Sequence, residues 1–341
     1  MNIAVISFYL PPIDRIGSGV QTHYLANAYV RAGHKVTMLS PYDVGDVDAL
    51  YDLCKVECGR RNRTIHFAWN LRKVDYSKFD FIHAGMDDWA LLGVKKPFHI
   101  RTFHGSCFAE AMVAKDVRSK IRMSWLGLTE WMSCAVATKC VAVSKNTLRQ
   151  IPFCRDVVWN GIDKSIFHPS KTKSDHPVIL FVGTLHSRKR GQMLLDCFVN
   201  EIRKAIPNAE LWIVRETADP GVDGVKVFGS VTNELLADLY RRAWVFCLPS
   251  TYEGFGVPYI EAMASGTPVV ATPNVGALEV TEDGRYGIVC QDEALGTCLV
   301  EVLSNAKTRD TYVQLGLERT QHLDWDTLIL LYLDMLPAGI K

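Results

Sequence analysis

Short apolar runs alternate with amphipathic segments along the first half of the chain. Asn2–Phe8 and Lys35–Ser40 have the length and composition of buried strands, and Val20–Ala32 between them has its apolar residues at helical spacing. Further strands are predicted at Thr64–Ala68, Phe79–Ala84, Phe98–Phe103, Cys140–Val143 and Asp156–Trp159. This alternation predicts an α/β fold with a doubly wound parallel sheet.

The same pattern starts again in the second half. Strands are predicted at Val178–Val182, Glu210–Val214, Val225–Phe228, Trp244–Leu248, Pro268–Thr272 and Gly287–Val289, with helices such as Thr232–Arg242 between them. The segment between the halves, Asn160–Lys173, is polar and contains proline, as linkers do. A chain of 341 residues exceeds what one core usually holds, so we expect two domains, 1–165 and 174–318.

Composition and charge exclude several classes of protein. Hydrophobic residues make up 48% of the chain and charged residues 22%, which is typical of a globular fold and not of a disordered chain. The net charge of +1 lacks the basic excess of a nucleic-acid-binding protein. Ten cysteines are scattered along the chain, and the pair Cys54 and Cys58 has no second pair at metal-binding spacing, so we expect ordinary thiols.

Neither end of the chain carries an export or membrane signal. Met1–Leu10 is apolar but has no basic flank and runs into Pro11-Pro12, which predicts a strand and its exit loop. The apolar tail Leu328–Leu336 is interrupted by Asp334 and is too short to cross a bilayer. We therefore expect a cytoplasmic protein.

The most specific chemistry lies in the segment Pro249–Thr272, which follows a predicted buried strand. Gly254 and Gly256 let the backbone approach a ligand closely. Pro258 suits the first turn of a helix, so we expect a helix from Val257, with free amides that would face an anion.

Two carboxylates bracket this turn. Glu253 lies in the loop and Glu261 about one turn inside the helix, so both side chains can reach one ligand from different heights. A carboxylate accepts two hydrogen bonds, which suits a vicinal diol such as that of a ribose or hexose. The structural alternative is that Glu253 caps the turn and Glu261 only complements the helix dipole.

The sequence of this segment, PSTYEGFGVPYIEAMASGTPVVAT, resembles the donor-site signature of family 4 glycosyltransferases. These are retaining enzymes with the GT-B architecture, two facing Rossmann-like domains with a cleft between them. The resemblance implies that Glu253 holds the hydroxyls of the transferred sugar and Glu261 the ribose of the nucleotide. It places four backbone amides beside the sugar and phosphate, those of Gly254, Phe255, Gly256 and Val257.

A cluster of cations, in Gly183–Gly191 (GTLHSRKRG), follows the first strand of the second half and opens a helix. A solvated cationic helix start is the alternative to a diphosphate site, but cations there oppose the helix dipole unless an anion joins them. The family has an arginine, four residues and then a lysine here. Lys189 matches the lysine, Thr184 stands at the arginine position, and we expect Arg188 to replace the missing arginine.

Two positions in the first half resemble donor contacts of the family. Gly19 lies where the family's first strand-to-helix loop ends near the transferred sugar, and His104 matches a histidine at a strand end that faces this sugar. Read locally, Gly17-Ser18-Gly19 also begins a dinucleotide fingerprint, but Thr22 stands where a third glycine or alanine belongs. A lone histidine is often structural.

The resemblance implies retention at the anomeric carbon, with a leaving phosphate oxygen taking the acceptor proton. Cations and helix amides would stabilise the leaving diphosphate, so we expect no metal, no cofactor and no protein nucleophile. Lys189, Glu253 and His104 are the expected catalytic residues. Asp87-Asp88 looks like a metal-binding acid pair, but its two acids are adjacent and a helix start explains them.

The acceptor, a glycan, lipid or small molecule, is expected on the N-terminal domain. Within Ala111–Trp131 three cations, Lys115, Arg118 and Arg122, share one helical face, and apolar residues share another. This segment would either rest on anionic lipid at the cytoplasmic face of a membrane or be a domain helix with a solvated face. No nucleic-acid partner is expected.

The tail, with Trp325 followed by an apolar helix, resembles the closing segment of the family, which implies that residues 319–341 cross back to the first domain. The implied function is transfer of a hexose-type sugar from a nucleotide diphosphate sugar to a hydroxyl. One alternative is a nucleotide-sugar epimerase of the same architecture, which would need acid and base residues beyond His104. The other is a catalytically silent sugar-nucleotide-binding subunit, which should have lost Glu253 or Lys189.

Overall fold

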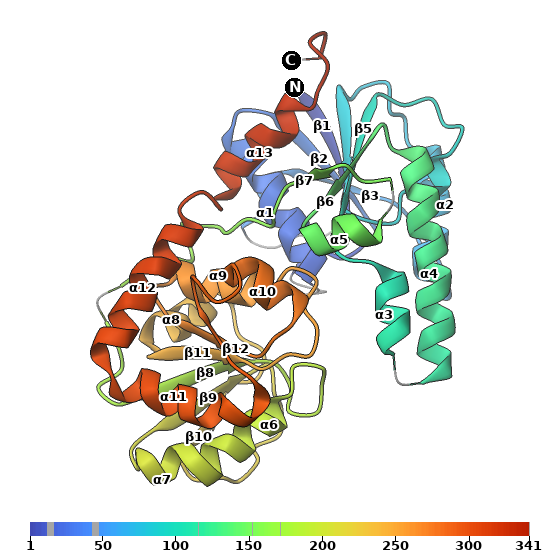
Figure 1. Ribbon diagram of the computed structural model, residues 1–341. Helices are drawn as coiled ribbons and strands as arrows, with labels where there is room; N and C mark the ends of the chain where they lie inside the picture. Colours follow the sequence, from blue (N-terminus) through green and yellow to red (C-terminus); the bar gives the residue numbers. More distant parts are fainter. Residues whose placement is uncertain (12–16, 43–47, 115, 152, 171, 341) are drawn as a thin grey trace. The chain divides into compact units, whose positions relative to one another are not determined.

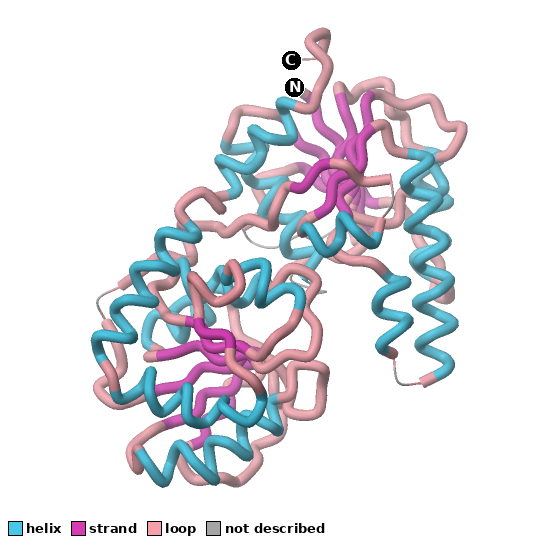
Figure 2. Tube along the Cα trace, viewed as in Figure 1, coloured by secondary structure: helices cyan, strands magenta, loops and turns pink. Residues whose placement is uncertain are grey.

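The computed structural model describes the chain except residues 12–16, 43–47, 115, 152, 171 and 341. The described residues form two compact units: unit 1 is Met1–Gly161 with Trp325–Lys341, and unit 2 is Ile162–Asp324. In each unit a parallel sheet lies between layers of helices, as Figures 1 and 2 show. The predicted α/β class with doubly wound parallel sheets is confirmed.

Within the described residues, unit 1 has a parallel sheet of seven strands in the order β3-β2-β1-β4-β5-β6-β7. The strands are β1 (Asn2–Ile6), β2 (Lys35–Ser40), β3 (Asp52–Lys55), β4 (Phe81–Ala84), β5 (Phe98–Phe103), β6 (Lys139–Ala142) and β7 (Asp156–Val157). The helices are α1 (Gly17–Arg31), α2 (Arg63–Asn70), α3 (Cys107–Val113), α4 (Val117–Val136), α5 (Lys145–Gln150) and α13 (Trp325–Asp334). The strand order reverses between β1 and β4, so helices cover both faces: α1 and α13 lie on one face, and α2 and α4 on the other (Figure 1).

Unit 2 has a described parallel sheet of six strands in the order β10-β9-β8-β11-β12-β13. The strands are β8 (Val178–Val182), β9 (Glu210–Val214), β10 (Val225–Val227), β11 (Val245–Leu248), β12 (Val269–Ala271) and β13 (Ile288–Val289). The helices are α6 (Gly191–Cys197), which continues through a π-helical turn at Phe198–Ile202 into α7 (Arg203–Ala205), then α8 (Asn233–Arg242), α9 (Val257–Ala264), α10 (Val275–Thr281), α11 (Leu295–Ser304) and α12 (Ala306–Thr320). All residues of β8 and β11 are buried, which explains their continuous apolar sequences.

The C-terminal helix α13 belongs to unit 1 through a buried aromatic and polar contact. The ring of Tyr332 lies 4.6 Å from that of His83 on β4, and the Thr102 hydroxyl on β5 lies 3.3 Å from the Tyr332 hydroxyl. At the start of the helix, Trp325 packs so closely on Gly161 that a Cβ there would lie 2.6 Å from the indole. Gly161 therefore has to lack a side chain for α13 to dock.

The prediction of a strand at Thr64–Ala68 is wrong, because these residues lie in helix α2. Their β-branched and aromatic residues suggested a strand, but the buried positions are Phe67, Ala68 and Leu71, which is helical spacing. The edge strand β3 was not predicted, since only its middle residues are even half-buried and it lacks an apolar run.

Candidate functional site

The site in unit 2 forms where the strand order of the sheet reverses. β8 and β11 pair in parallel there, with Val245 opposite Ile179, so the loops that follow them leave the same edge side by side. The loop after β8 carries Arg188 and Lys189, and the loop after β11 carries Glu253. The Thr251 N–H donates to the Arg188 carbonyl at 2.9 Å, which ties the two loops together.

Helix α9 begins at Val257, as predicted. Gly256 precedes it with φ 99°, in the left-handed region that favours glycine, and a Cβ on Gly256 would meet the ring of Tyr259. Pro258 lies in the first turn, where its missing N–H costs nothing. Pro258 has no N–H and the Tyr259 N–H donates to the Gly256 carbonyl at 2.9 Å, so the Val257 N–H is the donor of the first turn that is left without an intrahelical partner and suits an anion.

The loop between β11 and α9 is held from behind by the start of α10. A Cβ on Gly276 would lie 2.6 Å from the Glu253 carbonyl oxygen and 2.8 Å from that of Phe255, so only glycine allows this approach. Asn274 caps α10 and donates through Nδ2 to the Ser250 carbonyl at 3.1 Å. These contacts fix the backbone on which Glu253 is carried.

The Glu253 carboxylate is buried and paired with a cation. Its residue is only 6% exposed, and Arg188 Nη1 donates to Oε1 at 2.7 Å. The same guanidinium nitrogen also donates to the Tyr252 carbonyl. Arg188 thus holds Glu253 in a charge-assisted bond, and its role on a diphosphate stays a prediction.

Glu261 projects from the first turns of α9 and accepts a bond from Tyr240. The Tyr240 hydroxyl on α8 donates to Glu261 Oε2 at 3.2 Å. Burial raises the pKa of Glu261, while the Arg215 guanidinium, the Tyr240 bond and the Lys189 ammonium act in the opposite direction. Glu261 therefore interacts electrostatically with both Arg215 and Lys189.

Lys189 interacts electrostatically with both acids. Its ammonium donates to the Val182 carbonyl at 2.8 Å, at the end of β8. Burial lowers the pKa of Lys189 to about 8, and the nearby carboxylates of Glu253 and Glu261 act in the opposite direction. The structure thus brings together the predicted Lys189, Glu253 and Glu261 within unit 2.

The next cation along the loop, Arg190, is bound within the protein. It takes a left-handed conformation before α6 and donates to the Pro249 carbonyl at 2.6 Å, to Thr272 Oγ1 at 2.8 Å and to both carboxylate oxygens of Asp292. Arg190 therefore secures the start of the loop after β11. Thr184, which stands where the family has an arginine, is exposed.

Two predicted residues, His104 and Gly19, lie in unit 1. His104 follows β5, and its Nδ1 is buried with no hydrogen-bond partner among the described residues. Burial lowers the pKa of His104 to about 4, and the Arg101 charge adds to this effect, so the ring is neutral at pH 7. Gly19 lies in α1, where a Cβ would be 2.7 Å from the Tyr9 carbonyl oxygen, so helix and loop approach closely. Their donor contacts stay predictions.

Two family models match the chain. Residues 16–165 match the model described as Glycosyltransferase Family 4, and residues 176–305 match the model described as Glycosyl transferases group 1. The chain belongs to glycosyltransferase family 4. Its two matched regions fall one in each half of the chain.

Curated relatives of this family 4 chain are similar at low identity. The phosphatidyl-myo-inositol mannosyltransferase of Mycolicibacterium smegmatis is 29% identical over 202 residues, which cover 53% of this chain and 52% of that protein. An uncharacterized glycosyltransferase of Methanocaldococcus jannaschii is 26% identical over 337 residues and 84% of each chain. The chain thus spans about half the length of the mannosyltransferase.

Solved structures share the fold over nearly the whole family 4 chain. Sucrose-phosphate synthase from Thermosynechococcus elongatus has a TM-score of 0.79 at 22% identity and covers 98% of each chain. WaaG, a glycosyltransferase involved in lipopolysaccharide biosynthesis, has a TM-score of 0.76 at 17% identity, covering 99% of this chain and 100% of that chain. The Anabaena protein HepE in complex with UDP-glucose has a TM-score of 0.76 at 16% identity, covering 98% of this chain and 100% of that chain. These likenesses confirm the GT-B fold.

The prediction that a helix start explains Asp87-Asp88 is wrong for the side chain of Asp88. Asp88 precedes a 3₁₀ turn at Trp89–Leu91, but its side chain caps nothing. Its carboxylate lies 3.0 Å from His99 Nε2 and 3.6 Å from Arg101 Nε, all three residues being buried. Burial alone would raise the pKa of Asp88, but Arg101 and His99 outweigh it and hold the pKa at about 2. Asp88 therefore neutralises a buried cation.

The predicted cationic face lies on a helical hairpin of unit 1. Arg118 and Arg122 are exposed on α4, whereas Lys115 lies outside the described residues. The sequence segment Ala111–Trp131 spans two helices, α3 and α4, and not one. No described helix is both long and apolar enough to span a bilayer.

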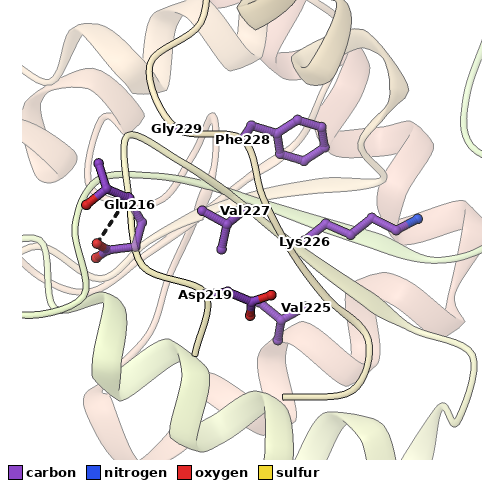
Figure 3. Close-up of a pocket in the computed structure, with 8 residues that line it drawn as sticks. Glu216, Asp219, Val225, Lys226, Val227, Phe228 and Gly229 are labelled. Atoms are coloured by element: carbon purple, nitrogen blue, oxygen red, sulfur yellow. Dashed lines mark hydrogen bonds between the residues drawn. The ribbon is translucent and has the colours of Figure 1, made fainter. Parts of the chain in front are cut away.

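Sequence reasoning missed Arg215, which directly follows β9 in this family 4 chain. A pocket is lined by the turn that follows Arg215, by strand β10 and by the two residues after β10, and Figure 3 shows its lining side chains. They include Glu216, which binds its own turn through Thr217 N–H, Val227 and Phe228. The position of Arg215 after a buried strand was the one sequence signal for it.

Proposed function

We propose that this family 4 chain is a retaining hexosyltransferase, which moves a sugar from a nucleotide diphosphate sugar to a hydroxyl. The observation that carries this proposal is that the Lys189 ammonium interacts electrostatically with the carboxylates of Glu253 and Glu261, at the edge of the sheet where α9 begins. One cation and a helix N-terminus suit a diphosphate, and two acids suit two sets of hydroxyls. We propose that domain 174–318 binds the donor and domain 1–165 the acceptor, with 319–341 returning to the first domain.

The proposed reaction breaks the bond between the anomeric carbon and the diphosphate oxygen. Positive charge develops on the sugar and additional negative charge on the leaving diphosphate. Lys189 and the α9 amides stabilise the leaving group, so no metal is required. The acceptor oxygen bonds to the anomeric carbon on the face that the leaving group vacates, and the acceptor proton passes to a phosphate oxygen.

The acids have separate proposed roles. Glu253, held by Arg188, accepts hydrogen bonds from hydroxyls of the transferred sugar, and Glu261 accepts bonds from the ribose. His104 is proposed to bond a sugar hydroxyl, because its neutral ring has one donor and one acceptor nitrogen. We propose that the backbone at Gly19 and at residues 254–257 also contacts the donor.

Relatives support a hexose donor. The names of two of them state mannosyl transfer to phosphatidyl-myo-inositol and a complex with UDP-glucose. A silent nucleotide-sugar-binding subunit is disfavoured because Glu253 and Lys189 are both present in the site. An epimerase would need further acid and base groups around the sugar, and the residues assigned here supply only His104.

Incubation with UDP-, GDP- and ADP-sugars of glucose, mannose and galactose tests the function, with and without glycan and lipid acceptors. We expect release of the nucleoside diphosphate from one sugar nucleotide, faster with acceptor, and a product that keeps the anomeric configuration. Glu253→Gln should lower turnover more than nucleoside diphosphate affinity, and Glu261→Gln the reverse. Asp310→Asn, an exposed acid on α12, is the control. Conversion to an epimeric sugar nucleotide, or binding without turnover, would contradict the proposal.

We propose that the protein binds the surface of a membrane that contains anionic lipid and meets its acceptor there. Helix α4 exposes an apolar stripe at helical spacing, with Ile121 67%, Trp125 52% and Leu128 49% exposed. Arg118 and Arg122 lie on the same helix and would meet negatively charged headgroups. Val117 and Met132 extend the stripe along the helix, and Met112 adds to it from α3.

Co-sedimentation with vesicles tests this surface. We expect binding to vesicles that contain phosphatidylglycerol, weaker binding to pure phosphatidylcholine, and a fall with added salt. Ile121→Ser with Trp125→Ser should abolish binding, and Arg118→Ala with Arg122→Ala should remove its preference for anionic lipid. No binding by the parent protein would end the membrane proposal and leave the donor site untouched.

A further inference from the structure

The proposed diphosphate site has one fewer cation than the resemblance of its loop to family 4 glycosyltransferases implies. Thr184 is uncharged, and the expected replacement, Arg188, is engaged with the Glu253 carboxylate and the Tyr252 carbonyl. Lys189 alone would then face a group that gains negative charge during the reaction. A second cation at this edge would complete the site.

Arg215 lies on the strand next to the cationic loop. β8 and β9 pair in parallel with Val182 opposite Val214, and the Gly183 N–H donates to the Val214 carbonyl at 2.9 Å. Arg215 is the residue that follows, so it leaves the sheet edge beside the start of the loop that bears Thr184 and Lys189.

The turn that carries Arg215 is bonded to this loop. The Leu185 N–H, one residue beyond Thr184, donates to Glu216 Oε2 at 2.8 Å. The Arg215 N–H donates to the Gly229 carbonyl at 2.6 Å on the other side. These bonds fix the backbone of Arg215 with respect to the predicted diphosphate loop.

The backbone conformation of Arg215 is strained for a residue that carries a side chain. Its φ is 76°, in the left-handed region where a residue with a Cβ is strained and glycine is not. Its side chain is exposed, and no hydrogen bond or ion pair engages the guanidinium within the described part of the chain. An arginine that is strained and unpaired, beside a site for a dianion, is suited to binding a ligand.

The electrostatic effects of Arg215 reach both sides of the site. Its positive charge lowers the pKa of Lys189, after the larger effect of burial, and it opposes the effect of burial on Glu261. The guanidinium therefore interacts electrostatically with the ammonium proposed for the diphosphate and with the acid proposed for the ribose.

We infer that Arg215 is a donor-binding residue whose guanidinium contacts the diphosphate and supplies the charge that Thr184 lacks. This inference rests on the proposed function. Because a guanidinium forms paired bonds with phosphate oxygens, its contribution depends on the second phosphate of the nucleotide.

Calorimetric titration with UDP, GDP and ADP and with the matching monophosphates tests the inference. Arg215→Gly removes the charge and suits the backbone, so the thermal unfolding midpoint should stay the same or rise. We expect it to weaken binding of the preferred diphosphate by about 10- to 100-fold and of the monophosphate by less than about threefold. Lys204→Ala, which removes an exposed cation on α7, is the matched control and should leave both affinities within about twofold.

A rescue variant tests the link to Thr184. Thr184→Arg combined with Arg215→Gly should restore most of the lost diphosphate affinity. The inference is overturned when Arg215→Gly keeps the diphosphate affinity within twofold, when it weakens diphosphate and monophosphate equally, or when Thr184→Arg restores nothing. A parent protein that binds none of the nucleoside diphosphates overturns the proposed function as well, so the two failures are distinct.

Discussion

The guanidinium of Arg188 lies 2.7 Å from the buried carboxylate of Glu253. The pair joins the loop after β8 to the loop after β11, at the point where the sheet of unit 2 reverses its strand order. Arg188 is half-exposed and Glu253 is not, so the arginine compensates an acid that would otherwise be buried without a cation next to it. The sugar-binding role proposed for Glu253 thus depends on Arg188.

Arg188→Ala should therefore lower turnover more than nucleotide affinity. Without the guanidinium the Glu253 carboxylate loses its orienting bond, and we expect kcat to fall about 10- to 100-fold. The Kd for the nucleoside diphosphate should change by less than about threefold, and Arg188→Lys should be intermediate. An affinity that falls as much as kcat would instead place Arg188 on the diphosphate.

Substitution of Lys189 should lower turnover, whereas substitution of the adjacent Arg190 should lower stability. Lys189→Ala removes an ammonium that interacts electrostatically with both acids, and turnover should fall by about 100-fold or more. Arg190→Ala breaks bonds to Asp292, Thr272 and Pro249, and the free energy of unfolding should fall by about 1–3 kcal/mol. Urea unfolding and turnover measured on both variants separate the two effects. Equal, small losses of turnover would remove the diphosphate role of Lys189.

Nucleotide affinity should depend on pH through Lys189. Its pKa is about 8 in the free protein, so the ammonium charge is present below pH 8 and is lost as the pH rises through this value. We expect constant affinity for the nucleoside diphosphate near pH 7 and a decline above pH 8, approaching tenfold per pH unit. Calorimetry between pH 6.5 and 9.5 measures this decline. Lys189→Arg should abolish it, and an unchanged decline in that variant would assign it to another group.

The buried Asp88 should stabilise unit 1. Asp88→Asn leaves Arg101 without its compensating charge, and we expect the free energy of unfolding to fall by about 3–5 kcal/mol. The pKa of Asp88 is lowered on folding, so its contribution is present above about pH 4 and is lost as the pH falls towards 2. Urea unfolding at pH 7 and at pH 3 should show a smaller difference between parent and variant at pH 3. Glu57→Gln, at an exposed position, is the control, and an equal effect would contradict this role.

The elements that sequence reasoning located share one property. Strands such as Val178–Val182 are buried on both faces, so their apolar runs are continuous, and α9 is marked by Gly256 and Pro258. Both signals are local. The helix α2 was misread because Thr64 and Ile65 are β-branched, although its buried residues are Phe67 and Ala68.

The contacts that sequence reasoning missed are set by strand pairing. Asp88 meets His99 and Arg101 because β4 and β5 pair with Ala84 opposite Arg101, which no local pattern reveals. Arg215 lies next to the start of the loop that bears Lys189 because β8 pairs with β9. Residue types at Lys189, Glu253 and Glu261 indicated the site, but their partners depended on the fold.

A crystal structure of the protein with its preferred nucleoside diphosphate would show whether the donor binds at this edge of the sheet in unit 2. We expect ribose hydroxyls bonded to Glu261, with the diphosphate on the Lys189 ammonium and on backbone amides at the start of α9. A nucleotide bound elsewhere, with Glu261 and Lys189 turned away from it, would contradict the proposed donor site.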